Sequence, residues 1–251
     1  GNDLTSGASN IIQGYQAGYN ATTADNTVAI GRQAIGLGVL TGADNIAIGY
    51  QAGYDLTSGT RNFMVGYYAG YELNTGSDNI MMGYAAGLQA TTATSTVAIG
   101  TQAIGLGVLT GNHNIALGNQ AGNDLTSGTL NVMMGYRAGY NATTATNTVA
   151  IGRSAMLSGV LTGTDNTAIG NEAGYSLTSG TYNFFAGYRA GYYATTATNT
   201  VAIGREAIGL GVLTGTDNIA IGYKAGYSLT SGTYNNFQGY AAGQNATTAS
   251  H

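Results

Sequence analysis

The sequence predicts an all-β chain that folds as a parallel β-solenoid, a β-roll-like stack of about 14 rungs. A glycine with a short apolar run before it and an alanine three residues after it recurs fourteen times, at steps of 17 or 18 residues. The apolar runs are rich in Val and Ile, which favour strands. The 42 glycines and the lack of helical periodicity disfavour helices. We expect a single repeat domain over residues 1–251, because each rung of such a stack contacts mainly its neighbours.

The recurring glycine is a marker by which the rungs can be aligned. The alanine three residues after it is present in all fourteen copies. A glycine at a fixed position indicates a turn, and an alanine at a fixed position indicates close packing of chain segments. The marker glycines are Gly14, Gly31, Gly49, Gly66, Gly83, Gly100, Gly118, Gly135, Gly152, Gly170, Gly187, Gly204, Gly222 and Gly239.

Each rung is expected to contribute two short strands. Apolar residues stand three residues and one residue before the marker, as in residues 28–30 and 46–48. This alternation predicts a strand with one buried side, so we expect these two columns to face the core. Stacked at about 4.8 Å per rung, fourteen rungs would form a rod of about 67 Å. The second strand is predicted by an apolar column ten residues before the marker, which begins with Leu4, Ala21, Val39, Leu56 and Leu73.

Polar columns mark the corners of the rungs. Every rung has Ser or Thr eight residues before the marker, followed by Gly or Ala, which is typical of a turn. Four residues before the marker stands Asn in ten rungs and Thr in four. Stacked amides can bond from rung to rung and satisfy polar groups that are costly to bury unpaired. We therefore predict a structural asparagine ladder, which comprises Asn45, Asn62, Asn79, Asn114, Asn131, Asn166, Asn183, Asn218 and Asn235.

Three rung types alternate with a period of 52 residues, as Gly100, Gly152 and Gly204 show. One type contains Ala-Thr-Thr-Ala, the next Gly-Val-Leu-Thr-Gly and the third Leu-Thr-Ser-Gly. An extra rung of 17 residues interrupts this cycle at about 72–88. A one-dimensional stack tolerates such an insertion, because only neighbouring rungs are affected. The 18-residue step always enters Gly-Val-Leu-Thr-Gly, which predicts a bulge or a longer turn there.

Charge and composition exclude several classes of function. Only 7% of the residues are charged and the net charge is −4, so the chain lacks the basic patch that a nucleic acid partner requires. Cysteine is absent, which excludes disulfides and thiolate metal sites. No apolar run approaches a membrane span, so we expect a chain that is not membrane-embedded. Residues 1–7 match residues 122–128, and we expect the chain to be a segment of something longer.

Catalysis and metal binding are not expected. The chain has two histidines, His113 and His251, and no carboxylate pair recurs near either of them. His113 occupies the corner position that holds Asp44 in a sister rung. Aspartate at such a turn commonly bonds its own backbone, and the Gly-Gly-x-Gly-x-Asp signature of calcium-binding rolls is missing. We therefore predict no enzyme activity, no cofactor and no metal.

Tyrosine is the residue type that most suggests binding. Of 19 tyrosines, fifteen fall one or five residues after a marker glycine. One interpretation is that the rings stack along the solenoid or pack between protomers. The other is a sugar-binding or adhesive ridge. The first tyrosine column holds Tyr15, Tyr50, Tyr67, Tyr84, Tyr136, Tyr188, Tyr223 and Tyr240, and the second holds Tyr19, Tyr54, Tyr71, Tyr140, Tyr175, Tyr192 and Tyr227.

Threonine columns offer a further alternative. Thr-x-Thr at eight and six residues before the marker, as in residues 196–198 and 214–216, resembles the regular threonine arrays of ice-binding solenoids. Ala8, Asp25 and Ala43 interrupt this array in the first half of the chain. Threonine at these positions also fits a role in corners and ladders.

The residues Val28-Ala29-Ile30-Gly31, which recur at 97–100, 149–152 and 201–204, resemble the head repeats of trimeric autotransporter (YadA-like) adhesins. The string Asn-Ile-Ala-Ile-Gly-Tyr-Lys-Ala-Gly-Tyr at 218–227 is similar to repeats of phage tail-fibre and surface-fibre proteins. The resemblance covers nearly the whole chain. It implies left-handed parallel β-rolls that associate as trimers and bind host matrix or cell surfaces.

Together these observations predict a noncatalytic structural segment, the shaft or head of a surface adhesin or phage tail fibre. We expect a homo-oligomer, either a trimer or an end-to-end filament, that is extracellular, at a cell surface or on a virion. The expected partner is a host-surface glycan or matrix protein, with the tyrosine columns as candidate binding residues. The alternative is an ice- or glycan-binding module that uses the threonine or tyrosine columns.

Overall fold

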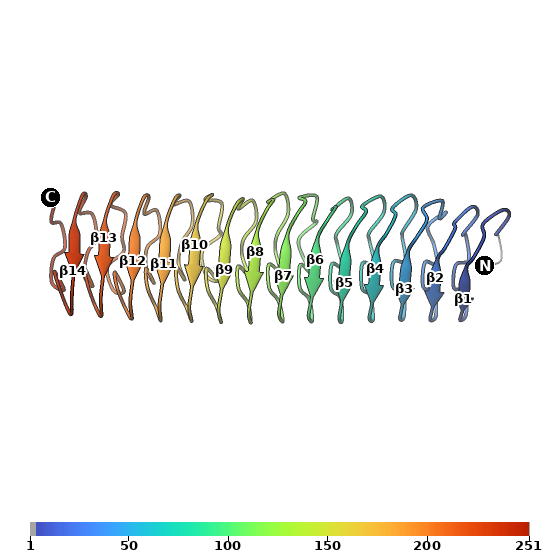
Figure 1. Ribbon diagram of the computed structural model, residues 1–251, viewed down its shortest axis with the longest axis horizontal. Helices are drawn as coiled ribbons and strands as arrows, with labels where there is room; N and C mark the ends of the chain where they lie inside the picture. The colour runs from blue at the N-terminus through green and yellow to red at the C-terminus, as the bar shows by residue number, and fades with distance from the viewer. Residues whose placement is uncertain (1–3, 251) are drawn as a thin grey trace. The chain divides into compact units, whose positions relative to one another are not determined.

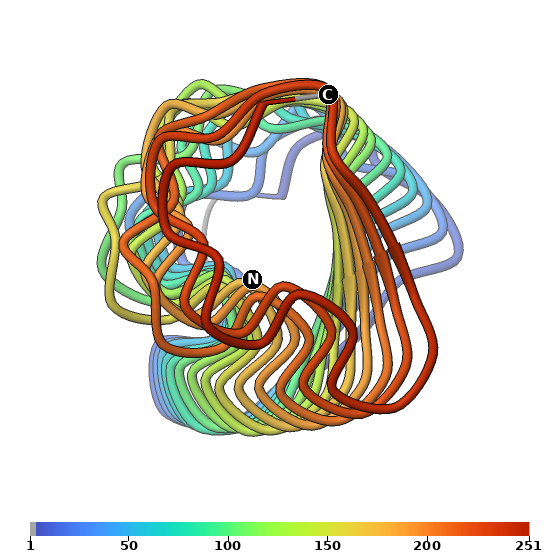
Figure 2. The same ribbon diagram turned by 90° about the vertical axis from the view of Figure 1, so that its left-hand side faces the viewer.

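The computed structural model describes residues 4–250, so Gly1, Asn2, Asp3 and His251 lie outside the described residues. The chain divides into two compact units, residues 1–129 and residues 130–251. Each unit is a parallel β-solenoid with no helix among its described residues, which confirms the predicted fold class. Figure 1 shows the strands of each unit side by side and pointing the same way, and Figure 2 shows the successive rungs of each unit overlying one another.

Every rung contributes one strand of three residues, which ends immediately before a marker glycine. The pairing is parallel and in register, so that Ile46 lies beside Phe63 and Ile48 beside Val65. The first unit contains β1 (Ile11–Gln13), β2 (Val28–Ile30), β3 (Ile46–Ile48), β4 (Phe63–Val65), β5 (Ile80–Met82), β6 (Val97–Ile99) and β7 (Ile115–Leu117). The second unit contains β8 (Val132–Met134), β9 (Val149–Ile151), β10 (Thr167–Ile169), β11 (Phe184–Ala186), β12 (Val201–Ile203), β13 (Ile219–Ile221) and β14 (Asn236–Gln238).

The second strand predicted for each rung is reduced to isolated bridges in the described residues, such as the one between Ala90 and Leu109. Backbone hydrogen bonds still join the rungs in this region, and the amide of Thr57 donates to the carbonyl of Asn74 over 2.9 Å. The chain bends at Thr57 and Ser58, however. The Ser/Thr-Gly corner therefore interrupts the extended backbone before a regular strand can form.

The strands face the opposite way from the sequence prediction. In β3, Ala47 is fully buried, whereas Ile46 and Ile48 flank it on the outside and Ile48 is 36% exposed. The middle residue is the buried one in every strand from β2 to β13. The interior is narrow, because a turn alanine from each rung and a leucine from most rungs already occupy much of it. The two columns that were expected to face the core form an apolar outer face instead.

The packing of the interior explains why the rungs repeat in threes. Ile208, four residues after a marker, is buried, and both interior positions of the next rung are small, at Ala220 and Gly226. A methyl group built on Gly226 would lie 3.0 Å from Cδ2 of Phe237 in the following rung and 3.5 Å from Cγ1 of Ile208. Large side chains of two rungs thus fill the space of the rung between them. The cycle of 52 residues is therefore a packing unit.

The extra rung at 72–88 repeats the rung type that has a large residue in its strand. Its Met81 follows Met64 of the preceding rung. A methyl group built on Gly70 would lie 2.8 Å from Sδ of Met64 and 3.0 Å from Sδ of Met81, so both side chains reach the same interior space. Methionine is unbranched and adapts to irregular gaps. Two successive rungs of one type can therefore share the interior.

The marker glycines are fixed by both backbone conformation and contact between rungs. Gly66 has a φ of +138°, which residues with a side chain rarely adopt. A Cβ atom on Gly66 would also clash with the carbonyl oxygen of Gly83 in the next rung. The invariance of the marker follows from these two constraints.

The longer step adds a turn that protrudes, as predicted. Leu37 and Val39 are 56% and 55% exposed, and the buried position passes to Leu40. Val39 stands in the apolar column that predicts the second strand, but the residue that packs into the interior is the next one, Leu40. One added residue shifts the chain by one position along an alternating segment, so the neighbouring Leu40 turns inward.

Candidate functional site

The asparagine column forms hydrogen-bonded ladders inside both units. In the first unit, Asn62 Nδ2 donates to Asn45 Oδ1 over 3.1 Å and to the carbonyl of Gly76 over 2.9 Å. In the second, Asn183 Nδ2 donates to Asn166 Oδ1 over 2.9 Å. All nine predicted asparagines are buried. Their amides connect adjacent rungs and are not available to an external ligand.

The tyrosine columns stack along the surface of each unit. The ring centroids of Tyr50 and Tyr67 are 4.8 Å apart, and those of Tyr67 and Tyr84 are 5.5 Å apart. In the second unit, Tyr175 stacks on Tyr192 at 4.8 Å. Stacking leaves ring area open to solvent, since Tyr84 remains 52% exposed. The exposed members are Tyr15, Tyr19, Tyr67, Tyr84, Tyr136, Tyr188 and Tyr240, and the other tyrosines of the two columns are half-buried.

The residue two positions after each marker, which we call the polar column, places cations beside these rings in the second unit. Arg189 lies 5.2 Å from the ring centroid of Tyr188 and 5.1 Å from that of Tyr192. Its Nε is also 2.6 Å from a carboxylate oxygen of Glu172. Lys224 lies in the same way over the two tyrosines of its own rung. In these rungs, cation–π contacts fill the space between the two tyrosine columns.

In the first unit, the polar column carries a glutamine ladder and then a gap. Gln33 Nε2 donates to Gln16 Oε1 over 3.0 Å, and Gln51 Nε2 donates to Gln33 Oε1 over 2.9 Å. Two rungs later the column holds Ala85, which is 3% exposed. Above its short side chain lies a hollow of about 350 Å³, lined by Tyr68, Tyr71, Glu72, Tyr84, Ala85, Leu88 and Gln102.

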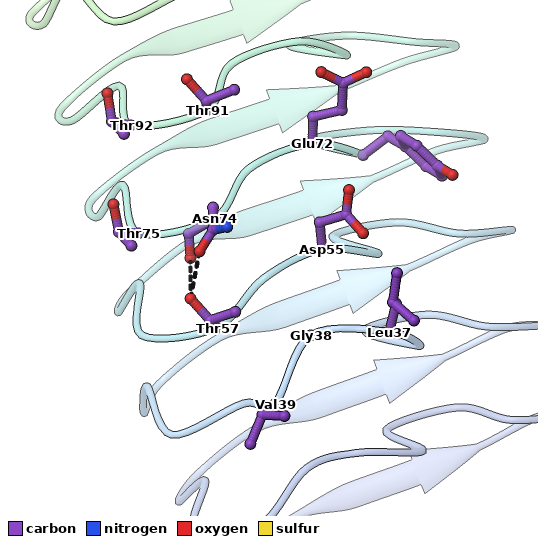
Figure 3. A pocket seen from close by; sticks show the side chains of 11 residues that line it. Leu37, Gly38, Val39, Asp55, Thr57, Glu72, Asn74, Thr75, Thr91 and Thr92 are labelled. Carbon is purple, nitrogen blue, oxygen red and sulfur yellow. Dashed lines mark hydrogen bonds between the residues drawn. The ribbon is translucent and has the colours of Figure 1, made fainter.

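A shallow groove of about 700 Å³ shares Tyr71 and Glu72 with this hollow. Figure 3 shows Asp55 and Glu72 on one side of the groove and Thr75 and Thr92 on the other. Asp55 and Glu72 occupy the same position of successive rungs. Among residues 4–250, neither of these two carboxylates takes part in an ion pair. The groove and the hollow together form a locally anionic surface.

The titration behaviour of this surface agrees with its charge. Burial raises the pKa of the Asp55 carboxyl, and the nearby Glu72 raises it further. Burial likewise raises the pKa of Tyr71, with the charge of Asp55 as the next cause. Asp78, on the same unit, differs, because a hydrogen bond from Arg61 lowers its pKa. Negative charge is therefore balanced at Asp78 and unbalanced at the groove.

The threonine positions support the structure of the corners. Ser58 and Thr196, both eight residues before a marker, lie in bends of the chain. The hydroxyl of Thr178 donates to the carbonyl of Thr195 in the next rung over 2.9 Å. The corner residue His113 has a left-handed backbone with a φ of +58°. These positions therefore hold turn residues in the described chain.

Two further findings concern sites that depend on clusters or long segments. Within residues 4–250, no group of three or more His, Cys, Asp or Glu residues could hold a metal ion. The same part of the chain contains no helix that is long and apolar enough to span a membrane.

Sequence reasoning missed the polar column. Its residues have a left-handed backbone, with a φ of +53° at Ala85 and +54° at Arg189, and this aims them along the surface. The available signal was the alternation of charge over successive rungs, from Glu172 and Arg189 to Glu206 and Lys224. Side chains at one position of adjacent rungs lie close together, so this alternation indicates a column of paired charges.

Comparison with known proteins identifies no relative. The chain matches no family model, no curated protein and no solved structure.

Proposed function

We propose that the chain is a noncatalytic structural segment of a surface adhesin or tail fibre, and that it forms a homo-oligomer through the outer face of its strands. The observation that carries this proposal is the reversed orientation of the strands. Their bulky apolar side chains, which a single chain would be expected to bury, lie at the surface. The resemblance of the repeats to adhesin and tail-fibre repeats supports the same role.

We define the outer face as the first and third residues of every strand. In each unit these residues form two columns about 7 Å apart, which run over seven strands and give a strip roughly 30 Å long. Ile80 and Ile219 are among its more exposed members, at 39% and 38% exposed, and others such as Ile46 are half-buried. Continuous apolar strips of this kind mark interaction surfaces in soluble proteins.

A second copy of the chain is the partner that fits this face. The outer face carries no charged residue, so two such faces meet without burying an unpaired charge. A symmetric homo-oligomer brings identical surfaces together and covers the strip on every copy. Polar residues occur in the outer face at Gln13 of β1, at Thr167 of β10 and at Asn236 and Gln238 of β14. We propose a trimer, with an end-to-end filament as the alternative arrangement.

In this role the solenoid supplies length and stiffness, because backbone hydrogen bonds join each rung to the next. The surface columns then contact a host-surface glycan or matrix protein. The proposed location is extracellular, at a cell surface or on a virion. An ice- or glycan-binding module remains the alternative, and thermal hysteresis of the purified chain tests its ice-binding form.

Size-exclusion chromatography with light scattering tests the oligomer. A trimer gives a fixed mass of three chains over a wide concentration range, whereas a filament grows with concentration. A monodisperse monomer at all concentrations would contradict the proposed assembly.

Variants locate the interface. Ile48→Gln, Ile99→Gln and Ile203→Gln, combined in one chain, place in the outer face the residue that Gln13 and Gln238 already carry there. We expect this chain to dissociate into folded monomers.

The matched control changes exposed apolar residues elsewhere. Leu37→Gln, Leu106→Gln and Leu210→Gln alter three leucines of the protruding turns, which are 49–56% exposed. We expect this control to keep the wild-type mass. If the control dissociates and the outer-face variant does not, the turns form the interface instead.

A further inference from the structure

We propose that the hollow above Ala85 binds an organic ammonium group, such as the quaternary ammonium head of choline. The hollow is formed by turn residues of the first unit, and it lies outside the outer face. The inference therefore assigns a ligand class to a surface that the proposed oligomer leaves uncovered.

The second unit shows what the polar column holds when the chain fills it itself. Arg137 lies 5.3 Å from the ring centroids of both Tyr136 and Tyr140, the two tyrosines of its rung. Lys224 lies 5.4 Å and 4.8 Å from the ring centroids of the corresponding tyrosines. Each cation reaches the rings from a left-handed residue two positions after the marker. The space between tyrosine columns is therefore suited to positive charge.

At Ala85 the backbone is the same and the side chain is missing. Its φ of +53° matches the +54° of Arg137, so the position is built like one that carries a cation. Three tyrosines, Tyr68, Tyr71 and Tyr84, line the hollow. Tyr68 and Tyr71 meet edge to face with their ring centroids 5.2 Å apart. Aromatic rings arranged around one space are the common means of holding a quaternary ammonium group.

The charge of the hollow also favours a cation. Glu72 lines it, and among residues 4–250 its carboxylate takes part in no ion pair. In the second unit, by contrast, Glu172 pairs with Arg189, and Glu206 lies 3.5 Å from the ammonium of Lys224. The hollow thus has tyrosines and a carboxylate around it, as those sites do, and no cation of its own. The groups come from other positions, because the rung of Ala85 supplies Tyr84 and Leu88, while Tyr71 and Glu72 belong to the preceding rung.

The first unit has no other cation to supply. It contains two Lys or Arg residues and seven Asp or Glu residues, which gives a net charge of −5. Arg32 lies between Tyr15 and Tyr50, at 5.7 Å from each ring centroid. Arg61 is bound to Asp78 at 2.6 Å. A cation at the hollow must therefore come from outside the unit.

An NMR titration of the full-length chain with choline chloride tests the proposal. We expect saturable binding with a dissociation constant on the order of 1 mM, as for a few partly solvated cation–π contacts. The neutral isostere 3,3-dimethylbutan-1-ol has the same shape without the charge. We expect it to bind at least about tenfold more weakly, and equal affinity for the two compounds would overturn the proposal.

The decisive variant is Ala85→Arg. It restores a cation at a backbone conformation that Arg137 and Arg189 already adopt, so the fold should be retained. The arginine fills the hollow and faces Glu72, and choline binding should disappear. Undiminished choline binding in a folded Ala85→Arg chain would overturn the proposal.

Two milder variants probe the walls. Glu72→Gln introduces the residue that the same position carries as Gln89, and Tyr84→Thr introduces the residue found as Thr101. Each should weaken choline binding roughly threefold to tenfold. The control, Asp124→Asn, removes an acid at the position of Glu72 in a distant rung of the same unit and should leave binding unchanged. A loss of affinity in the control equal to that of Glu72→Gln would indicate general charge attraction and overturn the assigned site.

Discussion

The two units have the same rung architecture and opposite surface chemistry. The first carries two basic and seven acidic residues, and the second carries five basic and four acidic residues. In the second unit, acids and bases alternate along the polar column and pair, as Glu172 and Arg189 do. In the first unit, glutamines occupy most of that column, and it is interrupted at Ala85 by a hollow beside the unpaired Glu72.

Comparison of the two units shows at which positions of the rung the residue type is kept and at which it varies. Interior residues contact both neighbouring rungs at fixed distances, so glycine, alanine and asparagine recur in the same positions of both units. Surface residues need only suit the side chain above and the side chain below. Charge can therefore be rewritten along a surface column without altering the rungs beneath it.

The largest expected effect comes from a constraint that both units share. Gly66→Ala in the first unit and Gly187→Ala in the second each force a strained backbone and a clash with the next rung, and each should cost about 4 kcal/mol or more of unfolding free energy. Chemical denaturation monitored by circular dichroism measures the loss. Gly239→Ala separates the two causes, because Gly239 has a φ of +118° and no atom near its missing side chain. It should cost only about 1–3 kcal/mol, and an equal loss at all three sites would show that the clash is irrelevant.

Removing an asparagine of the ladder should lower the unfolding free energy by a smaller amount, and by the same amount in both units. Asn183→Ala leaves the carbonyl of Ala197 and the amide of Thr200 without their side-chain partner in the interior, and it removes one of the two hydrogen bonds that Asn166 Oδ1 accepts from residue 183. We expect a loss of about 2–3 kcal/mol, and the same for Asn62→Ala in the first unit. Asn183→Thr, which introduces the residue found at Thr200, should cost less. A ladder variant that is silent in one unit would mean that the two interiors are not equivalent.

The acid groove should give the first unit a pH dependence of its own. Because the pKa of Asp55 is raised in the folded chain, protonation of its carboxyl stabilises the fold relative to the ionised form. This stability is fully present below the unfolded pKa, where the carboxyl is neutral like an asparagine, and it is lost as the pH rises through the folded pKa. Asp55→Asn should therefore raise the melting temperature at pH 7 and leave it unchanged near pH 3. Melting curves of the two chains at both pH values test this. A lower melting temperature of the variant at pH 7 would mean that the carboxylate makes a favourable contact there.

The smallest effect should be confined to the second unit. Glu172→Gln removes the partner of Arg189, a partly exposed ion pair expected to contribute about 0.2–1 kcal/mol. The loss should shrink as salt is added, since the pair lies at the surface. Gln33→Ala, in the glutamine ladder of the first unit, should show no such salt dependence. Hydrogen exchange of the two units, measured at low and high salt, provides the comparison.

Much of the fold could be predicted from the sequence, because repetition makes each column visible many times over. The period, the parallel stacking and the positions of the turns follow from fourteen aligned glycines. The orientation of the strands could not be predicted. Alternation identifies two faces, and Ile46 and Ile48 are more hydrophobic than Ala47, so hydrophobicity alone selected the wrong one. The width of the interior, which sets the choice, depends on residues of other parts of the rung.

The candidate site was harder to predict than the fold. The tyrosine columns were visible, but their relation to the polar column depends on a left-handed backbone at residues such as Tyr68 and Ala85, which are not glycines. The hollow arises from what Ala85 lacks relative to Arg137 and Arg189. The sequence shows an alanine at this position, but only the structure shows that tyrosines and a carboxylate surround the space that a longer side chain would fill.

The sharing of interior space between rungs bears on how such a gene can lengthen. Ile208 and Phe237 both reach the space beside Gly226 in the rung between them. Deleting that rung alone would therefore overfill the interior, and duplicating it would leave a void. Unequal crossing-over therefore succeeds in steps of 52 residues, or in single rungs only where the same large residue follows itself, as Met64 and Met81 do. The number of residues that can be added to this solenoid at one time is therefore set by the volume of its interior side chains, and it corresponds to three rungs.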